Sequence, residues 1–188
     1  ATVAAGLSPQ GLSLLNDVIG NKSVLDVDSV REIEALATTI AALGSLQRDG
    51  NWTTGSALPL PLTLDAPTLD ALNALGINGL TVADLPAFFE SLAALPSADA
   101  MDSLGELQAL ANRVIEANAL ALIRNFANIH EAPLPKLRDY NVLGISGITG
   151  GQLDSFNDAL ATMALTLDAS DATAKQQLLD MAAAFQLI

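Results

Sequence analysis

The sequence predicts an all-α protein made of tandem three-helix-bundle repeats, with about eight helices and no sheet. Three observations predict this class: the composition, an internal repeat, and helix-capping residues at matching places in the copies. Of the 188 residues, 51% are hydrophobic, many of them Ala and Leu, and only 4% are aromatic. Ala and Leu favour helices, whereas the aromatic residues that favour strands are scarce.

The internal repeat is clearest in two turn segments, LGINGLTVADL at Leu75–Leu85 and LGISGITGGQL at Leu143–Leu153. They lie 68 positions apart, and the same offset pairs Pro67 with Pro135. An earlier copy is offset by 73, because GLSPQGLSLLNDVI at Gly6–Ile19 matches GLTVADLPAFFESL at Gly79–Leu92.

Three copies follow from these matches. We expect a partial repeat at 1–58, with second and third helices plus a linker, then a three-helix repeat at 59–132 with a long third helix. A further three-helix repeat is expected at 133–188. The first copy lacks the opening part of the unit, so the sequence is expected to begin inside a repeat.

The first helix of each full copy is expected to be short, at Pro67–Leu75 and Pro135–Leu143. Proline at the start suits position N1, where its missing N–H costs nothing. Gly76 and Gly144 then end the helices, because glycine accepts a left-handed conformation.

The second and third helices are predicted from their caps. Ser8, Thr81 and Thr149 are expected N-caps of second helices. Third helices are expected to open with the capping boxes Ser29–Glu32 and Ser103–Glu106, and Asp171 occupies the same column in copy three. Apolar columns predict cores in the second helices at Leu85, Phe88 and Leu92, and at Leu153, Phe156 and Leu160.

The third helix of copy two is predicted to be nearly continuous from Ser103 to about His130. Its apolar residues recur at helical spacing without Gly or Pro. Later residues, Leu122, Phe126 and Ile129, are expected to pack on copy three around Leu137 and Tyr140. Copy one is instead followed by a segment at 48–67 that is rich in Gly, Pro, Ser and Thr and is expected to be a linker.

Charge and composition exclude several functions. The net charge of −13 would repel a nucleic-acid backbone and an anionic lipid surface. There are no cysteines, which removes disulfides and thiolate chemistry. No apolar run approaches the roughly 18 residues that span a bilayer. We therefore expect neither nucleic-acid binding nor membrane insertion.

No residue pattern indicates catalysis, a cofactor or a metal. The glycines of GISGITGG are compatible with a phosphate cradle, but the segment follows a short helix and matches GINGLT, which favours a helix–helix turn. The lone His130 has no catalytic partners. Trp52, in the linker, is either a partner anchor or a local plug. Calcium is the alternative to helix capping for the acidic residues before third helices: Asp26, Asp28, Asp99, Asp102, Asp168 and Asp171.

The turn LGI-x-G-[LI]-T at Leu75–Thr81 and Leu143–Thr149 carries a family resemblance. So does the helix start D-S-x-x-E-[IL]-x-x-L at Asp28–Leu36 and Asp102–Leu110. Together they resemble the tandem helical repeats of very large bacterial surface adhesins. The helix order is also topologically similar to the albumin-binding three-helix modules of surface proteins. Copy three departs from the pattern because it lacks the capping-box Glu.

The resemblance implies a non-enzymatic, extracellular or cell-surface segment, acting as a stalk or spacer in adhesion or biofilm formation. Its expected partners are neighbouring repeats of the same chain. In the alternative, the modules recognise a host or matrix protein through a helix face. An exposed apolar patch kept in place between copies would favour that alternative.

Overall fold

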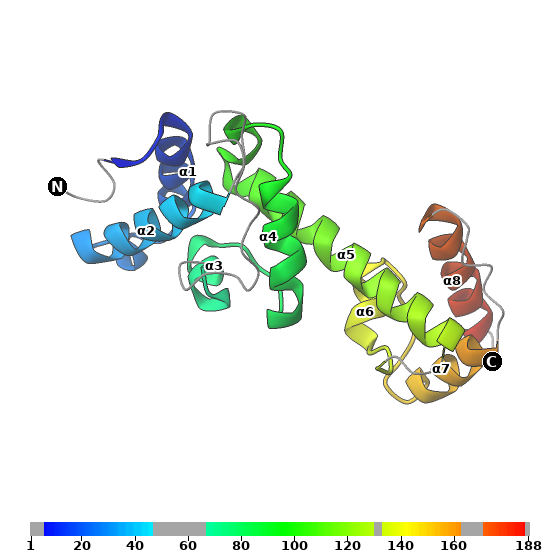
Figure 1. The fold of residues 1–188 in the computed structure, drawn as a ribbon. Coiled ribbons are helices and arrows are strands. Elements are labelled where there is room, and N and C mark those ends of the chain that lie inside the picture. Colours follow the sequence, from blue (N-terminus) through cyan, green and yellow to red (C-terminus); the bar gives the residue numbers. More distant parts are fainter. Residues whose placement is uncertain (1–5, 47–66, 130–132, 163–170, 187–188) are drawn as a thin grey trace. The chain divides into compact units, whose positions relative to one another are not determined.

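A computed structural model describes residues 6–46, 67–129, 133–162 and 171–186 of the chain (Figure 1). Within these ranges the protein is entirely helical and has no strand, which confirms the predicted class. The α-helices are α1 (Pro9–Gly20), α2 (Val30–Leu46), α3 (Leu69–Leu75), α4 (Leu85–Ala93), α5 (Leu104–Ile129), α6 (Leu137–Val142), α7 (Leu153–Thr162) and α8 (Asp171–Phe185). Short 3-10 turns are η2 (Val24–Asp26), η3 (Val82–Asp84) and η4 (Ala98–Met101).

The chain forms two compact units, Ala1–Val114 and Ile115–Ile188, and their boundary lies inside α5. The long third helix of copy two is thus confirmed at Leu104–Ile129. The division at 58 and 132 follows sequence repeats and not contacts, and it stays a prediction. Residues 48–66 of the predicted linker, which include Trp52, lie outside the described residues, and so does His130.

The first unit combines helices from copies one and two. Helix α1 packs against α2, and α2 in turn packs against α3 and α4. Apolar residues at helical spacing face inward on each element. The largest fully buried side chains of this unit are Leu14, Ile40, Leu43, Leu72, Leu75, Ile77, Phe88, Phe89, Leu92 and Leu107.

The second unit has its own core, which joins the later turns of α5 to α6, α7 and α8. Phe126 of α5 lies in this core with Tyr140, as expected from the sequence. The other α5 members are Ala119, Leu120, Ile123 and Ala127. Leu122 was expected among them but is only half-buried, because it lies to one side of the buried face. Ile129 ends the helix, and its side chain lies outside the described residues.

The repeated turns after α3 and α6 have the same geometry. Gly76 and Gly144 have positive φ values of 102° and 76°. The N–H of Ile77 donates to Leu72 O and that of Ile145 to Tyr140 O, each at 3.0 Å, in the Schellman pattern. Both isoleucines are buried, so the turn also anchors the core.

The prolines before these short helices were wrongly expected at position N1. Helix α3 begins at Leu69 behind the N-cap Thr68, whose Oγ1 accepts from Ala71 N at 3.2 Å. Helix α6 begins at Leu137 behind Lys136. Pro67 and Pro135 therefore precede the caps, where they are buried and cannot take part in the helix.

The starts of the second helices differ among copies. Ser8 caps α1 as expected, with Oγ accepting from Gly11 N at 3.1 Å. After Thr81 and Thr149 the α-helices begin at Leu85 and Leu153, three residues later than an N-cap there would place them. A 3-10 turn, η3, precedes α4, and a hydrogen-bonded turn precedes α7. In the predicted core columns, Phe88, Leu92, Phe156 and Leu160 are fully buried, whereas Leu85 and Leu153 are half-buried.

Candidate functional site

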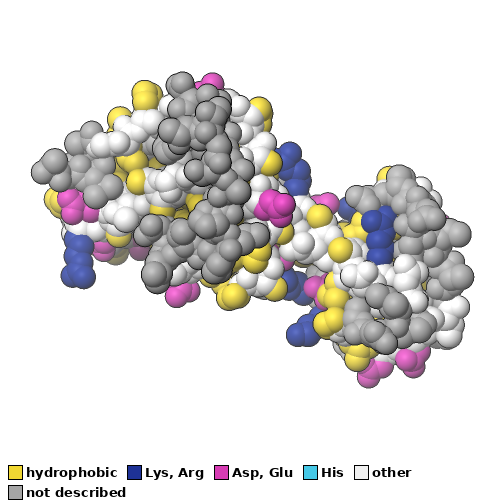
Figure 2. Space-filling model, viewed as in Figure 1, with side chains coloured by type: hydrophobic (Ala, Val, Ile, Leu, Met, Phe, Trp, Pro, Cys, Tyr) yellow, Lys and Arg dark blue, Asp and Glu magenta, His cyan; other side chains and the backbone are white. Residues whose placement is uncertain are grey.

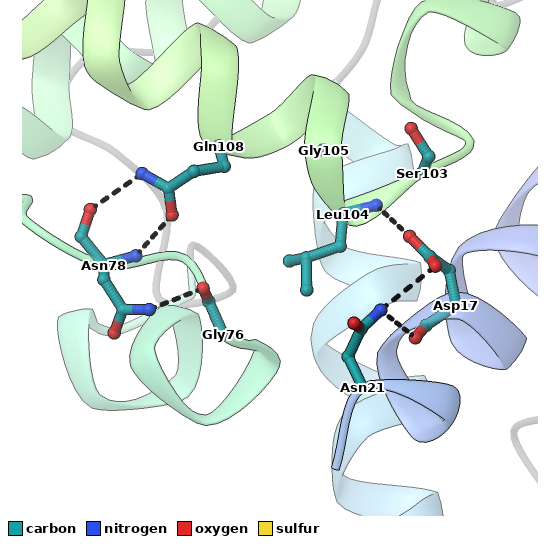
Figure 3. Close-up of a pocket in the computed structure, with 8 residues that line it drawn as sticks. All are labelled: Asp17, Asn21, Gly76, Asn78, Ser103, Leu104, Gly105 and Gln108. Carbon is teal, nitrogen blue, oxygen red and sulfur yellow. Dashed lines mark hydrogen bonds between the residues drawn. The ribbon is translucent and has the colours of Figure 1, made fainter.

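An open pocket of about 600 Å³ lies in the first unit, where copy one meets copy two. Helix α1, the turn after α3 and the start of α5 surround it (Figure 3). Its lining residues are Asp17, Asn21, Gly76, Asn78, Ser103, Leu104, Gly105 and Gln108.

Asp17 of α1 caps the third helix of the next copy. Its Oδ2 accepts a hydrogen bond of 2.7 Å from the N–H of Leu104, the first residue of α5 (Figure 3). Such an N–H has no partner within its own helix, and a carboxylate there also complements the helix dipole. Asn21 Nδ2 donates to Asp17 Oδ1 at 3.2 Å and to Asp17 O at 2.8 Å, which holds the carboxylate in place.

Gln108 of α5 binds the backbone of the repeated turn. Its Oε1 accepts from Asn78 N at 2.8 Å, and its Nε2 donates to Asn78 O at 3.0 Å. The side chain of Asn78 donates to Gly76 O at 2.8 Å. One amide side chain therefore fixes the turn of copy two against the start of its own third helix.

A further hydrogen bond links the two copies beside the pocket. Gln10 Nε2 of α1 donates to Asp99 Oδ1 of η4 at 3.0 Å, and α1 packs against η4. Gly76 lies close to Leu104, because a Cβ added there would be 3.2 Å from Leu104 Cδ2. The pocket is thus the edge of a junction between copies.

The polar side chains that line the pocket are hydrogen-bonded to protein groups. Ser103 Oγ donates to Glu106 Oε2 at 3.1 Å and accepts from Glu106 N at 3.3 Å, so its hydroxyl belongs to the cap of α5. The carboxylate of Asp17 and the amides of Asn21, Asn78 and Gln108 are likewise paired with protein groups. The polar side chains of the lining are therefore engaged with backbone or side-chain groups beside them.

The predicted capping boxes form, with one variation. Glu32 Oε2 accepts from Ser29 N at 3.0 Å while Ser29 Oγ accepts from Glu32 N at 3.3 Å. At α5 the carboxylate of Glu106 instead accepts from Asp102 N at 3.2 Å. Hydrogen bonds from Ser29 lower the pKa of Glu32, whereas partial desolvation and then repulsion from Glu106 raise the pKa of Asp102.

Two of the acidic residues that were weighed as calcium ligands accept hydrogen bonds from neighbouring side chains. Asp26 accepts from Ser23 Oγ at 2.8 Å, and Asp99 accepts from Gln10. In the described part of the chain, no group of three or more His, Cys, Asp or Glu residues is arranged to hold a metal ion. Asp171 is the first residue of α8, and Asp168 lies outside the described residues.

The Gly-rich segment GISGITGG forms the turn between α6 and α7, as favoured from the sequence. Gly147 has a φ of 92°. A Cβ there would collide with the side chain of Gln186, whose Nε2 donates to Ser146 O at 3.0 Å.

Asp17 and Gln108 were not singled out from the sequence. The sequence pattern could have indicated Asp17, because the repeat offsets place Glu90 and Asp158 in its column. All three copies therefore carry an acidic residue at this position. The indication for Gln108 is weaker, since Gln176 occupies its column in copy three. Gln176 Nε2 donates to Asp180 Oδ1 at 2.8 Å, just as Gln108 Nε2 donates to Asn112 Oδ1 at 2.8 Å, so the two columns share the bond to the residue four positions later.

The surface carries charges of both signs. On the face shown in Figure 2, Lys and Arg side chains are scattered among acidic and hydrophobic ones. None of the helices in the described ranges combines the length and the apolar character that crossing a bilayer requires.

Comparisons of the chain with protein-family models, curated proteins and solved structures gave no match. The geometry of the junction, the repeat and the surface therefore carry the functional argument.

Proposed function

We propose that the chain is a non-enzymatic repeat segment of a large bacterial surface adhesin, located at the cell surface and serving as a stalk or spacer in adhesion or biofilm formation. The observation that carries the proposal is the hydrogen bond from Leu104 N to Asp17, because it joins one copy to the next through a residue of the repeat itself. Repeats that contact their neighbours lengthen a protein without requiring a new fold.

The paired lining of the pocket supports a structural role over an enzymatic one. A catalytic site needs a group free to take or give a proton, or a nucleophile beside a base. At the junction the carboxylate of Asp17 caps a helix and the hydroxyl of Ser103 completes a capping box.

A second candidate is recognition of a host or matrix protein through a helix face. Three apolar side chains near the start of α2 favour it: Val24, Leu25 and Val30 are 80%, 79% and 69% exposed. The patch is not kept in copy two, where Ala98, Asp99 and Leu104 occupy these columns and Leu104 is half-buried. The stalk is therefore the preferred function.

A reach assay tests the proposal. The chain is inserted in one, two or three copies between a cell-surface anchor and a binding tip, and cells are tested for capture through a polymer layer. Capture should increase with copy number. Gly/Ser linkers with as many residues as each insert are the control, and their capture should rise less steeply with length, because the end-to-end distance of a flexible coil grows only as about the square root of its residue number.

A binding assay separates the two candidates. The purified chain should bind neither collagen, fibronectin nor serum albumin in surface plasmon resonance. Two results together would favour the recognition module over the stalk. One is saturable binding that is lost in the variant Val24→Ser/Leu25→Ser, and the other is capture that does not change with copy number.

A further inference from the structure

The cores of copies two and three differ at a pair of columns that lie on the first and second helices. In copy three Tyr140 of α6 is fully buried, and its hydroxyl donates to Asn157 Oδ1 of α7. Asn157 is 2% exposed, and its Nδ2 donates to Pro135 O at 3.0 Å. The Tyr140 ring also contacts Phe156 edge to face, with centroids 5.0 Å apart.

In copy two the same columns hold apolar residues. The offset of 68 places Leu72 at the position of Tyr140 and Phe89 at that of Asn157, and both are buried. The two copies therefore differ in polarity at both columns, and the order of the side-chain sizes is inverted. Copy two has its smaller side chain on the first helix, whereas copy three has its smaller side chain on the second.

Four other core columns of the first two helices and their turn are alike in the two copies. Leu75 and Leu143, Ile77 and Ile145, Phe88 and Phe156, and Leu92 and Leu160 are all buried. A first helix of one copy therefore has nearly the right surface to pair with the second helix of the other. Misassembly and domain swapping of this kind are characteristic failures of repeat proteins.

We propose that Tyr140 and Asn157 form a pairing key that keeps the helices of copy three from assembling with those of copy two. Tyr140 against Phe89 sets two large side chains together and leaves a buried hydroxyl without its acceptor. Leu72 against Asn157 sets two small ones together and leaves the buried Oδ1 of Asn157 without the hydroxyl that donates to it. Each wrong pairing therefore has a higher free energy than the native one, in which the Tyr140 hydroxyl and Asn157 Oδ1 are hydrogen-bonded to each other. The inference does not depend on the proposed adhesin function.

The test uses variants of the full chain in which copies two and three carry the same residues at these two columns. Tyr140→Leu/Asn157→Phe gives copy three the residues of copy two, and Leu72→Tyr/Phe89→Asn does the reverse. Each variant is unfolded in urea and refolded at several concentrations. Light scattering after gel filtration then measures dimer, and amide NMR counts signals for Ile77 and Ile145.

The expected result is that a matched variant refolds with at least a fivefold larger share of dimer than wild type, or with second signals for both isoleucines. Tyr140→Phe is the control, since it removes the hydroxyl but keeps the size inversion. It should lose stability yet refold as a monomer with single signals. If neither matched variant mispairs more than wild type, or if Tyr140→Phe mispairs as much as they do, the pairing key is wrong.

Discussion

At the scale of single residues, two carboxylates of this chain accept hydrogen bonds from backbone N–H groups at helix starts. Asp17 and Glu32 both stabilise a helix N-terminus, but Glu32 caps its own helix and Asp17 caps one 87 positions further along. Local capping is visible in the sequence, because the spacing from serine to glutamate is fixed. A cap supplied from another copy has no such spacing, which is why Asp17 was missed.

Removal of the Asp17 carboxylate should weaken the first unit. Asp17→Ala leaves Leu104 N without its acceptor, and we expect a loss of about 1 kcal/mol in unfolding free energy, measured by urea denaturation. Asp158→Ala is the matched control in copy three, where the side chain is exposed and should contribute almost nothing. Equal losses in the two variants would mean that the cap contributes little.

Stability should depend on the ionisation of Glu32. Its pKa is lowered from 4.5 in the folded protein, so the carboxylate stabilises the fold above that value. This contribution is lost as the pH falls below 4.5 and through the lowered pKa. Glu32→Gln should therefore reduce stability at pH 7 and differ little from wild type near pH 2. A constant difference across this range would contradict the assignment.

At the scale of elements, the sequence predicted helices and turns well and helix starts less well. Gly76 and Gly144 were found because only glycine takes positive φ without strain. The starts of α3, α4, α6 and α7 were misplaced, since a proline or threonine can precede a helix by several residues or occupy a 3-10 turn. The predicted buried face of α5 was wrong at Leu122, because a helix rich in Ala and Leu carries apolar residues on several sides.

Glycine substitutions should separate turn from helix. Gly76→Ala and Gly144→Ala force an L residue to a positive φ and should each cost about 1–2 kcal/mol. Gly105→Ala is the opposite control, because Gly105 lies in α5 with open space around its Cβ position. It should be neutral or stabilising by up to about 1 kcal/mol. Thermal unfolding of the three variants tests the signs, and a stabilising Gly144→Ala would refute the turn argument.

At the scale of the whole chain, the repeat in the sequence and the compact unit in space do not coincide. The first unit takes helices from two copies, and the second begins within the third helix of copy two. Periodicity identifies what is copied, but contacts decide what unfolds together. The boundaries of the compact units depend on packing between segments far apart in sequence, and local sequence patterns do not predict such packing.

Two core truncations should show which parts share a core. Phe88→Ala and Phe156→Ala each remove a fully buried ring and should cost about 3–5 kcal/mol. Hydrogen exchange should accelerate mainly at Leu14, Leu15 and Val18 in the first variant, and mainly at Leu143 and Ile145 in the second. If both variants accelerate exchange equally everywhere, the two units unfold as one.

The shared turn has a consequence for how such a gene can change its number of copies. Unequal crossing over between the stretches that encode Leu75–Thr81 and Leu143–Thr149 would join a first helix from one copy to a second helix from the other. Tyr140 and Asn157 lie on opposite sides of this stretch, so the exchange would separate them. The hybrid would combine Leu72 with Asn157, or Tyr140 with Phe89. Recombination inside this most similar segment should therefore yield genes whose proteins fold poorly. Among recombined genes that encode functional proteins, we expect the exchange points to lie outside the stretch that encodes α6 and α7.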